Sequence, residues 1–174
     1  MERLLSNIVG IPVYEDDGHR PLTTVRDVII DPESGVFLGV ITNIGKNEII
    51  AERDMLSLGE VIKIHGRDSI IPAEDVFRID EVLKSGKRIF GNKVVTENGE
   101  NLGKVFDLAI DKNTMALSKI FTAKGLLGLF RYDTRIISAK NIVEVLPHKI
   151  VIKGGTNLIM EKKEAKIPLE EAMS

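Results

Sequence analysis

Short runs that alternate β-branched and polar residues dominate the chain. In each half, three such runs are separated by turns rich in Gly, Asp and Asn, a spacing typical of a small β-barrel or sandwich. The pattern predicts strands at Gly10–Tyr14, Thr23–Ile30 and Val36–Thr42, and again at Asn92–Thr96, Lys104–Ile110 and Met115–Thr122. The expected fold class is therefore all-β.

The two halves align with each other as an internal repeat. Ile8–Thr42 aligns with Ile89–Thr122, so that turn glycines and strand aspartates fall at matching positions. A third block aligns Ile70–Ala73 with Ile136–Ala139, which places an insertion of the first copy between Thr42 and Ile70. The matched pairs include Gly10/Gly91, Val13/Val94, Gly18/Gly99, Leu22/Leu102, Val25/Val105, Asp27/Asp107, Ile30/Ile110, Asp31/Asp111 and Thr42/Thr122. Because the period is about half the chain, each copy is expected to be a small domain.

The repeat also predicts the domain organisation. We expect a first domain at residues 1–80, a linker at 81–87, a second domain at 88–155 and a charged C-terminal tail at 156–174. Ile71–Val76 and Ile137–Ile142 each predict the end of a strand followed by one helical turn. A final strand is predicted after each, at Phe77–Ile79 and at Val143–Leu146. Helix is otherwise expected only in short turns.

Composition narrows the classes of function. The 174 residues carry a net charge of −2, from 24 basic and 26 acidic side chains, so no global field attracts nucleic acid or a membrane. The absence of cysteine excludes disulfides and thiol chemistry. No apolar run approaches the roughly 18 residues of a membrane span. We expect a cytoplasmic protein with no nucleic-acid partner and no direct membrane insertion.

No motif predicts catalysis, a cofactor or a metal. Gly99–Lys104 loosely resembles a phosphate-binding loop, but a strand follows it where a helix is required. The histidines at positions 19, 65 and 148 lack the spacing of metal ligands. We therefore expect a protein that is not an enzyme.

The recurring aspartates are expected to be structural. Asp27 and Asp31, like Asp107 and Asp111, are four residues apart, which in a strand separates them by about 13 Å, too far for one ion. We expect Asp31 and Asp111 to cap turns, and Asp27 and Asp107 to form hydrogen bonds within strands.

The order of these elements resembles the PRC-barrel family. The resemblance rests on a strand, a turn glycine, Leu-x-x-Val-x-Asp-x-x-Ile-Asp at Leu22–Asp31, a further strand and Ile-Pro-x-x-Asp-Val at Ile71–Val76. The second copy fits at Leu102–Asp111 but departs later, where Ser138 and Asn141 replace Pro72 and Asp75. The resemblance implies two tandem small β-barrels with short helical turns, used as an interaction module without shared catalytic residues.

The tandem arrangement resembles archaeal PRC-barrel proteins of the FtsZ-based cell-division apparatus. This resemblance implies protein partners, namely the membrane anchor SepF or another PRC-barrel protein, homo- or hetero-oligomers, and recruitment from the cytoplasm to the division site. Two alternatives stay open: a ribosome-assembly factor that binds a ribosomal protein, and a small-molecule-binding barrel.

Two apolar segments are candidate interaction sites. Leu126, Leu127, Leu129 and Phe130 form a run between polar residues, which predicts a partner-binding patch; the alternatives are a cover over one barrel end or a strand. Ile150, Val151 and Ile152 precede two glycines and predict an exposed sheet edge available for pairing.

Overall fold

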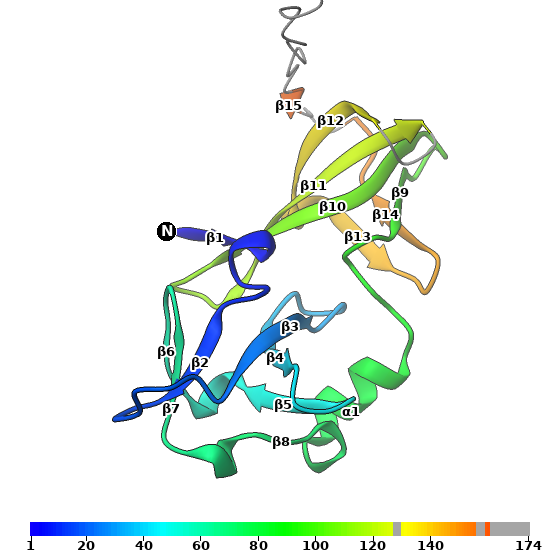
Figure 1. Ribbon diagram of the computed structural model, residues 1–174. Helices are drawn as coiled ribbons and strands as arrows, with labels where there is room; N and C mark the ends of the chain where they lie inside the picture. The colour runs from blue at the N-terminus through cyan, green and yellow to red at the C-terminus, as the bar shows by residue number, and fades with distance from the viewer. Residues whose placement is uncertain (127–129, 156–158, 161–174) are drawn as a thin grey trace, which may run out of the picture.

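The computed structural model describes residues 1–126, 130–155 and 159–160. Nearly all of its regular structure is strand, arranged in two curled, barrel-like sheets, one for each copy (Figure 1). The predicted all-β fold of two tandem barrels is therefore confirmed.

Among the described residues, seven strands of each copy follow one another in the same order across their sheet. The first sheet is ordered β6-β7-β2-β3-β4-β5-β8, and the second is ordered β13-β14-β9-β10-β11-β12-β15. The strands of the first copy are β2 (Pro12–Glu15), β3 (Thr23–Ile30), β4 (Phe37–Thr42), β5 (Glu48–Ala51), β6 (Met55–Leu58), β7 (Ile62–Ile64) and β8 (Ile71–Pro72). Those of the second are β9 (Lys93–Thr96), β10 (Asn101–Asp111), β11 (Ala116–Leu126), β12 (Phe130–Ser138), β13 (Ile142–Val145), β14 (Lys149–Ile152) and β15 (Ile159–Met160).

Short 3-10 turns connect several strands. They are η1 (Leu5–Asn7), η2 (Glu52–Asp54), η3 (Arg67–Ser69), η4 (Ala73–Asp75) and η5 (Ala139–Asn141). Two of them, η2 and η5, follow equivalent strands of the two copies. The helical turns predicted after Ile71 and after Ile137 are confirmed as η4 and η5.

The strand pairing corrects the third block of the repeat alignment. β7 pairs in parallel with β2 at Val13↔Ile62, as β14 pairs in parallel with β9 at Val94↔Ile150. β8 adds to β5 as β15 adds to β12. The equivalent of Ile136–Ile137 is therefore Ile49–Ile50 in β5, and the predicted insertion between Thr42 and Ile70 is wrong.

The two copies meet through equivalent residues. Val36 and Ala116 form an antiparallel bridge, and they occupy the same position in their repeats. Phe37 N donates to Met115 O and Leu117 N donates to Gly35 O, both at 2.8 Å. An antiparallel pair of equivalent residues lies on a local two-fold axis, the arrangement of a symmetric dimer interface.

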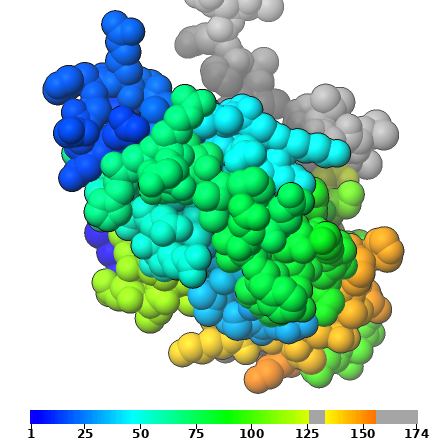
Figure 2. Space-filling view, turned by 90° about the horizontal axis from the view of Figure 1, so that it is seen from below, coloured from blue at the N-terminus to red at the C-terminus, as the bar shows by residue number. Residues whose placement is uncertain are grey.

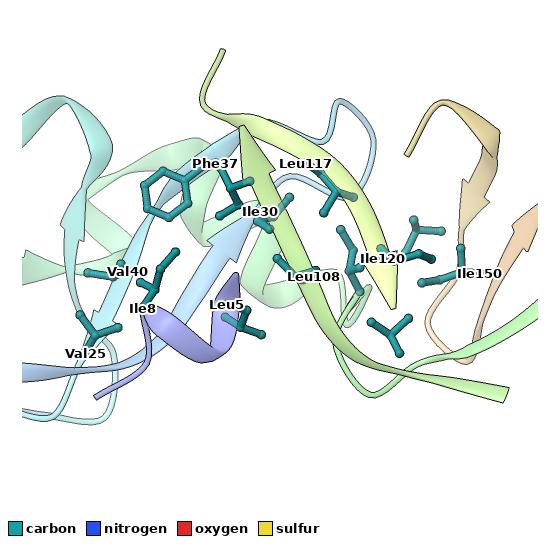
Figure 3. Close-up of a cluster of buried hydrophobic side chains, with 14 of the residues drawn as sticks. Leu5, Ile8, Val25, Ile30, Phe37, Val40, Leu108, Leu117, Ile120 and Ile150 are labelled. Carbon is teal, nitrogen blue, oxygen red and sulfur yellow. The ribbon is translucent and has the colours of Figure 1, made fainter. Parts of the chain in front are cut away.

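The cores of the copies merge at this axis. One cluster of buried side chains includes Leu5, Ile30 and Phe37 from the first copy together with Leu108 and Leu117 from the second. Figure 3 shows these side chains lying among the strands of both copies. The two barrels therefore share one continuous hydrophobic core.

The N-terminal strand and the single described α-helix break this symmetry. β1 (Glu2–Leu4) pairs antiparallel with β10 of the second copy (Figure 1). α1 (Phe77–Lys84) replaces the strand predicted at Phe77–Ile79, and it buries Ile79 and Val82 on one face. Their spacing of three residues is helical, and three residues of sequence were too few to distinguish it from strand alternation.

The predicted domain boundaries stay a prediction, because contacts cross them. β1 lies within residues 1–80 but joins the second sheet, and α1 runs into the predicted linker as far as Lys84. Within the predicted tail, Ile159 and Met160 form β15, while 156–158 and 161–174 lie outside the described residues. Among the helices that the structure describes, none has the length and apolar character to cross a membrane.

Candidate partner-binding clefts

Two clefts at the junction of the copies are equivalent under the repeat. The larger, with a volume of about 480 Å³, lies between the β3–β4 turn at Pro32–Gly35 and the η5–β13 segment of the second copy. The smaller, of about 320 Å³, lies between the β10–β11 turn, where Lys112 and Met115 line it, and β6 of the first copy. We call them the β13 cleft and the β6 cleft.

The wall of each cleft is an edge strand with a bulge. Among the described residues, β13 pairs only with β14 and β6 pairs only with β7. The register shifts between Ile142 and Glu144, and between Met55 and Ser57, which leaves Val143 and Leu56 as the extra residues.

The bulges turn apolar side chains outward at both clefts. Val143 is 49% exposed and Leu56 is 42% exposed, and each lines its own cleft. A bulge in an edge strand disrupts the hydrogen-bonding ladder and re-aims a side chain. A partner is therefore expected to contact the exposed side chain in each cleft, and not to add a strand to the sheet edge.

Charged residues form the rim of the β13 cleft. Lys87 Nζ donates to Glu33 at 3.3 Å, and Arg78 Nη2 reaches the other Glu33 oxygen at 3.3 Å. The hydrogen bonds from Lys87 and Arg78 lower the pKa of Glu33, so it stays ionised at neutral pH. Lys140 and Glu144 are exposed on the opposite rim. An apolar centre within a polar rim is the layout of a protein-binding site.

The aspartates hold the turns beside the clefts, as predicted. Asp31 Oδ1 accepts from Glu33 N at 3.0 Å, and Asp111 Oδ1 accepts from Asn113 N at 2.9 Å and Thr114 N at 3.0 Å. These bonds confirm that both residues cap turns.

The other two aspartates also have their predicted bonds. Asp27 accepts from Val28 N at 2.8 Å and Asp107 accepts from Leu108 N at 2.9 Å, in each case beside a bulge. Within residues 1–126, 130–155 and 159–160, no group of three or more His, Asp or Glu side chains could hold a metal ion.

Only part of the predicted patch lies within the described residues. The backbones of Leu126 and Phe130 pair where β11 meets β12, whereas Leu127 and Leu129 lie outside the described residues. The patch therefore stays a prediction.

The predicted free edge at Ile150–Ile152 is wrong. β14 is paired on both sides, with β13 and with β9, and Ile150 and Ile152 are fully buried. The β14 strand therefore lies inside the sheet, because Ile142–Val145, four residues earlier in the chain, covers its outer side. Among the described strands, β13 forms the edge of the second sheet on this side.

Sequence reasoning missed the residues that line the clefts. Val143 and Leu56 were not singled out, because a bulge interrupts alternation by one residue and looks like noise over a four-residue strand. Arg78 was missed because its segment was interpreted as a strand. One sequence feature could have indicated the two edge strands: β6 and β13 each follow directly after a helical turn, η2 and η5.

Comparison with known families agrees with this architecture. The PRC-barrel domain matches the chain twice, over residues 1–82 and 81–159. No curated protein sequence matches the chain. The two matches together span most of the 174 residues, and each coincides with one curled sheet. The chain therefore belongs to the PRC-barrel family, with two copies of the domain in tandem.

Proposed function

We propose that this protein is a non-enzymatic interaction scaffold that binds other proteins through the clefts at its barrel junction. The observation that carries the proposal is the duplication of the clefts, each with an outward-pointing apolar residue on a bulged edge strand. Bulky apolar groups within polar rims supply most of the binding energy in protein interfaces.

The shared core gives this scaffold its mechanism. Because the copies are joined by a backbone bridge and one hydrophobic cluster, the two clefts are held at a fixed separation and orientation. A scaffold of this kind binds without a large conformational cost, since its surfaces are already formed. Two similar sites in one chain can engage two partner molecules, or two copies of one partner.

We propose further that the protein acts in archaeal FtsZ-based cell division, through association with SepF and related PRC-barrel proteins. The resemblance of its tandem arrangement to division proteins of the same family supports this role. The protein would then work in the cytoplasm and be recruited to the division site by a membrane-anchored partner.

The test is affinity capture of the tagged full-length protein from its native cells. Enrichment of SepF or of a second PRC-barrel protein, reproduced with purified components, is the expected result. Co-sedimentation with ribosomal subunits, without capture of division proteins, would identify an assembly factor instead. Thermal stabilisation by a metabolite at millimolar concentration, with no protein captured, would favour a small-molecule-binding barrel.

A further inference from the structure

The N-terminal segment formed by β1 and η1, which we call the arm, has a counterpart in the linker between the copies. The alignment that relates Ile8 to Ile89 places Leu5 opposite Gly86 and Ser6 opposite Lys87. Both segments lead into the first turn of a barrel, beside a long strand of the other copy. Their side chains differ: Leu5 and Ser6 in the first segment correspond to Gly86 and Lys87 in the second.

In the second copy, the arm fills the position beside Asp107. Leu5 is only 3% exposed and belongs to the shared core, where it lies among side chains of both copies (Figure 3). Ser6 N donates to Asp107 Oδ1 at 3.2 Å, and Ser6 Oγ donates to Asp107 Oδ2 at 2.7 Å. The leucine thus fills an apolar position in the core, and the serine that follows it supplies two hydrogen bonds to the Asp107 carboxylate.

In the first copy, the linker leaves the corresponding position open. A cavity of about 110 Å³ lies between Asp27–Ile30 of β3 and Gly86–Phe90, a stretch that begins in the linker and continues toward β9. That volume is several times the roughly 30 Å³ of a water molecule in the liquid. Gly86 brings no side chain to it, and a Cβ added at Gly86 would meet no atom within 4 Å.

The polar side of this position is open as well. Among the residues that the structure describes, Asp27 accepts one hydrogen bond, from Val28 N. Lys87, the counterpart of Ser6, directs its backbone N–H to Ser85 Oγ at 3.2 Å and its ammonium group to Glu33. One carboxylate oxygen of Asp27 is therefore available to a donor from outside the chain.

Exposed apolar side chains surround the opening. Leu83 is 37% exposed and Phe90 is 51% exposed, and both line the cavity. In Figure 2, the green segment that contains α1 and the linker lies across this face, between the blue-to-cyan first copy and the orange strands of the second. An anchor cavity beside a large exposed aromatic ring is a typical centre of a peptide-binding site.

We propose that this cavity binds a segment of a partner protein in which a leucine is followed by a serine. The leucine side chain enters the cavity beside Gly86, and the serine N–H and O–H donate to Asp27, as Leu5 and Ser6 do at Asp107. Leu83 and Phe90 contact the residues on either side. This third site goes beyond the proposed scaffold function and does not depend on a role in cell division.

The occupant is a partner segment rather than the arm of a second copy. Leu5 and Ser6 are already bound at Asp107 of their own chain. A tethered segment has a high effective concentration at its site, so it is not free to bind elsewhere.

The direct probe is a synthetic peptide with the sequence of residues 1–8, titrated into the isotope-labelled full-length protein and followed by amide NMR shifts. We expect saturable shifts at Val28 and Phe90 with the peptide at up to about 2 mM, because short peptides bind weakly. A peptide with Leu5→Ala and Ser6→Ala is the matched control and should leave the shifts unchanged.

Protein variants locate the site. Asp27→Asn keeps an acceptor for Val28 N–H but removes the charge, and it should weaken binding about tenfold. Phe90→Ser should weaken it also, whereas Phe77→Ser, at an aromatic residue that is 77% exposed on α1 and outside the cavity, should not. The proposal is overturned if no saturable shifts occur. It is equally overturned if binding is lost in Asp107→Asn and kept in Asp27→Asn, because the peptide has then displaced the arm.

Discussion

Arg78 on α1 forms a two-pronged ion pair with Asp31 at the turn between β3 and β4. Its Nε donates to Asp31 Oδ2 at 3.0 Å and its Nη2 donates to Asp31 Oδ1 at 2.8 Å. Asp31 is only 6% exposed, whereas the Arg78 side chain is 42% exposed, so water reaches the pair from the Arg78 side and screens it in part. The contact links α1 to the β3–β4 turn, which leads directly into the Val36–Ala116 bridge between the barrels.

Replacing Asp31 should cost more stability than replacing its repeat counterpart. Asp31→Ala removes a turn bond and leaves the Arg78 guanidinium without its main partner, and we expect a loss of about 1–3 kcal/mol in the free energy of unfolding. Asp111→Ala removes turn bonds at a more exposed site and should cost less. Urea denaturation of both variants measures the difference, and binding by the folded fraction should survive. Equal losses would mean that Arg78 contributes nothing measurable.

The same pair should make stability depend on pH. Burial alone would raise the pKa of Asp31, but the hydrogen bonds from Glu33 N and from Arg78 outweigh it, so the pKa lies below its usual value. A carboxyl with a depressed folded pKa stabilises the protein fully above its unfolded pKa of about 3.9, and this contribution is lost as pH falls through the folded value.

The Arg78→Leu variant tests this dependence. At neutral pH the variant should unfold at a lower urea concentration than the wild type, and the gap between their midpoints should shrink below about pH 4. Lys84→Ala, which breaks only the exposed pair with Asp80, is the control and should have a small effect throughout. A gap that stays constant from pH 7 to pH 3 would show that packing, and not charge, explains the loss.

The clefts should depend on their bulged residues. Val143→Ser and Leu56→Ser should each weaken partner binding several-fold with little change in melting temperature, because both side chains are largely exposed. Ile44→Ser is the matched control, since Ile44 is equally exposed, at 42%, but lies away from both clefts. If the control loses as much affinity as Val143→Ser, the clefts are not the site.

The apolar run at the end of β11 and β12 gives a separate prediction. Leu129→Ser and Phe130→Ser should weaken partner binding while melting temperature changes little, as for exposed residues that carry binding energy. Truncating a buried aromatic residue costs roughly 3–5 kcal/mol. A destabilisation of that size in the thermal melt would place Phe130 in a core and remove the patch as a binding site.

The features that the sequence predicted are those with local causes. The turn bonds of Asp31 and Asp111 join residues two or three positions apart, so the local sequence is enough to predict them. The first two blocks of the repeat were found for the same reason, because glycine and aspartate positions are fixed by turn geometry.

The features that the sequence did not predict depend on partners far along the chain. Ile136–Ile137 can be aligned with Ile49–Ile50 or with Ile70–Ile71, and the strand pairing decides between them, because β5 pairs with β4 as β12 pairs with β11. The place of β14 inside the sheet depends on β9, and that of β1 depends on β10. The alternation of apolar and polar residues predicts which face of a strand is buried, but it does not predict which strand pairs beside it.

The bridge between Val36 and Ala116 has a consequence for how this protein could change over time. Two separate barrels joined at such an axis would be identical, and any substitution would alter both sides of the pair at once. With both barrels in one chain, each side varies alone: an arm is bound at Asp107, while a helix and an open cavity lie beside Asp27. The two faces of the molecule can therefore differ while the contact that joins the barrels is kept.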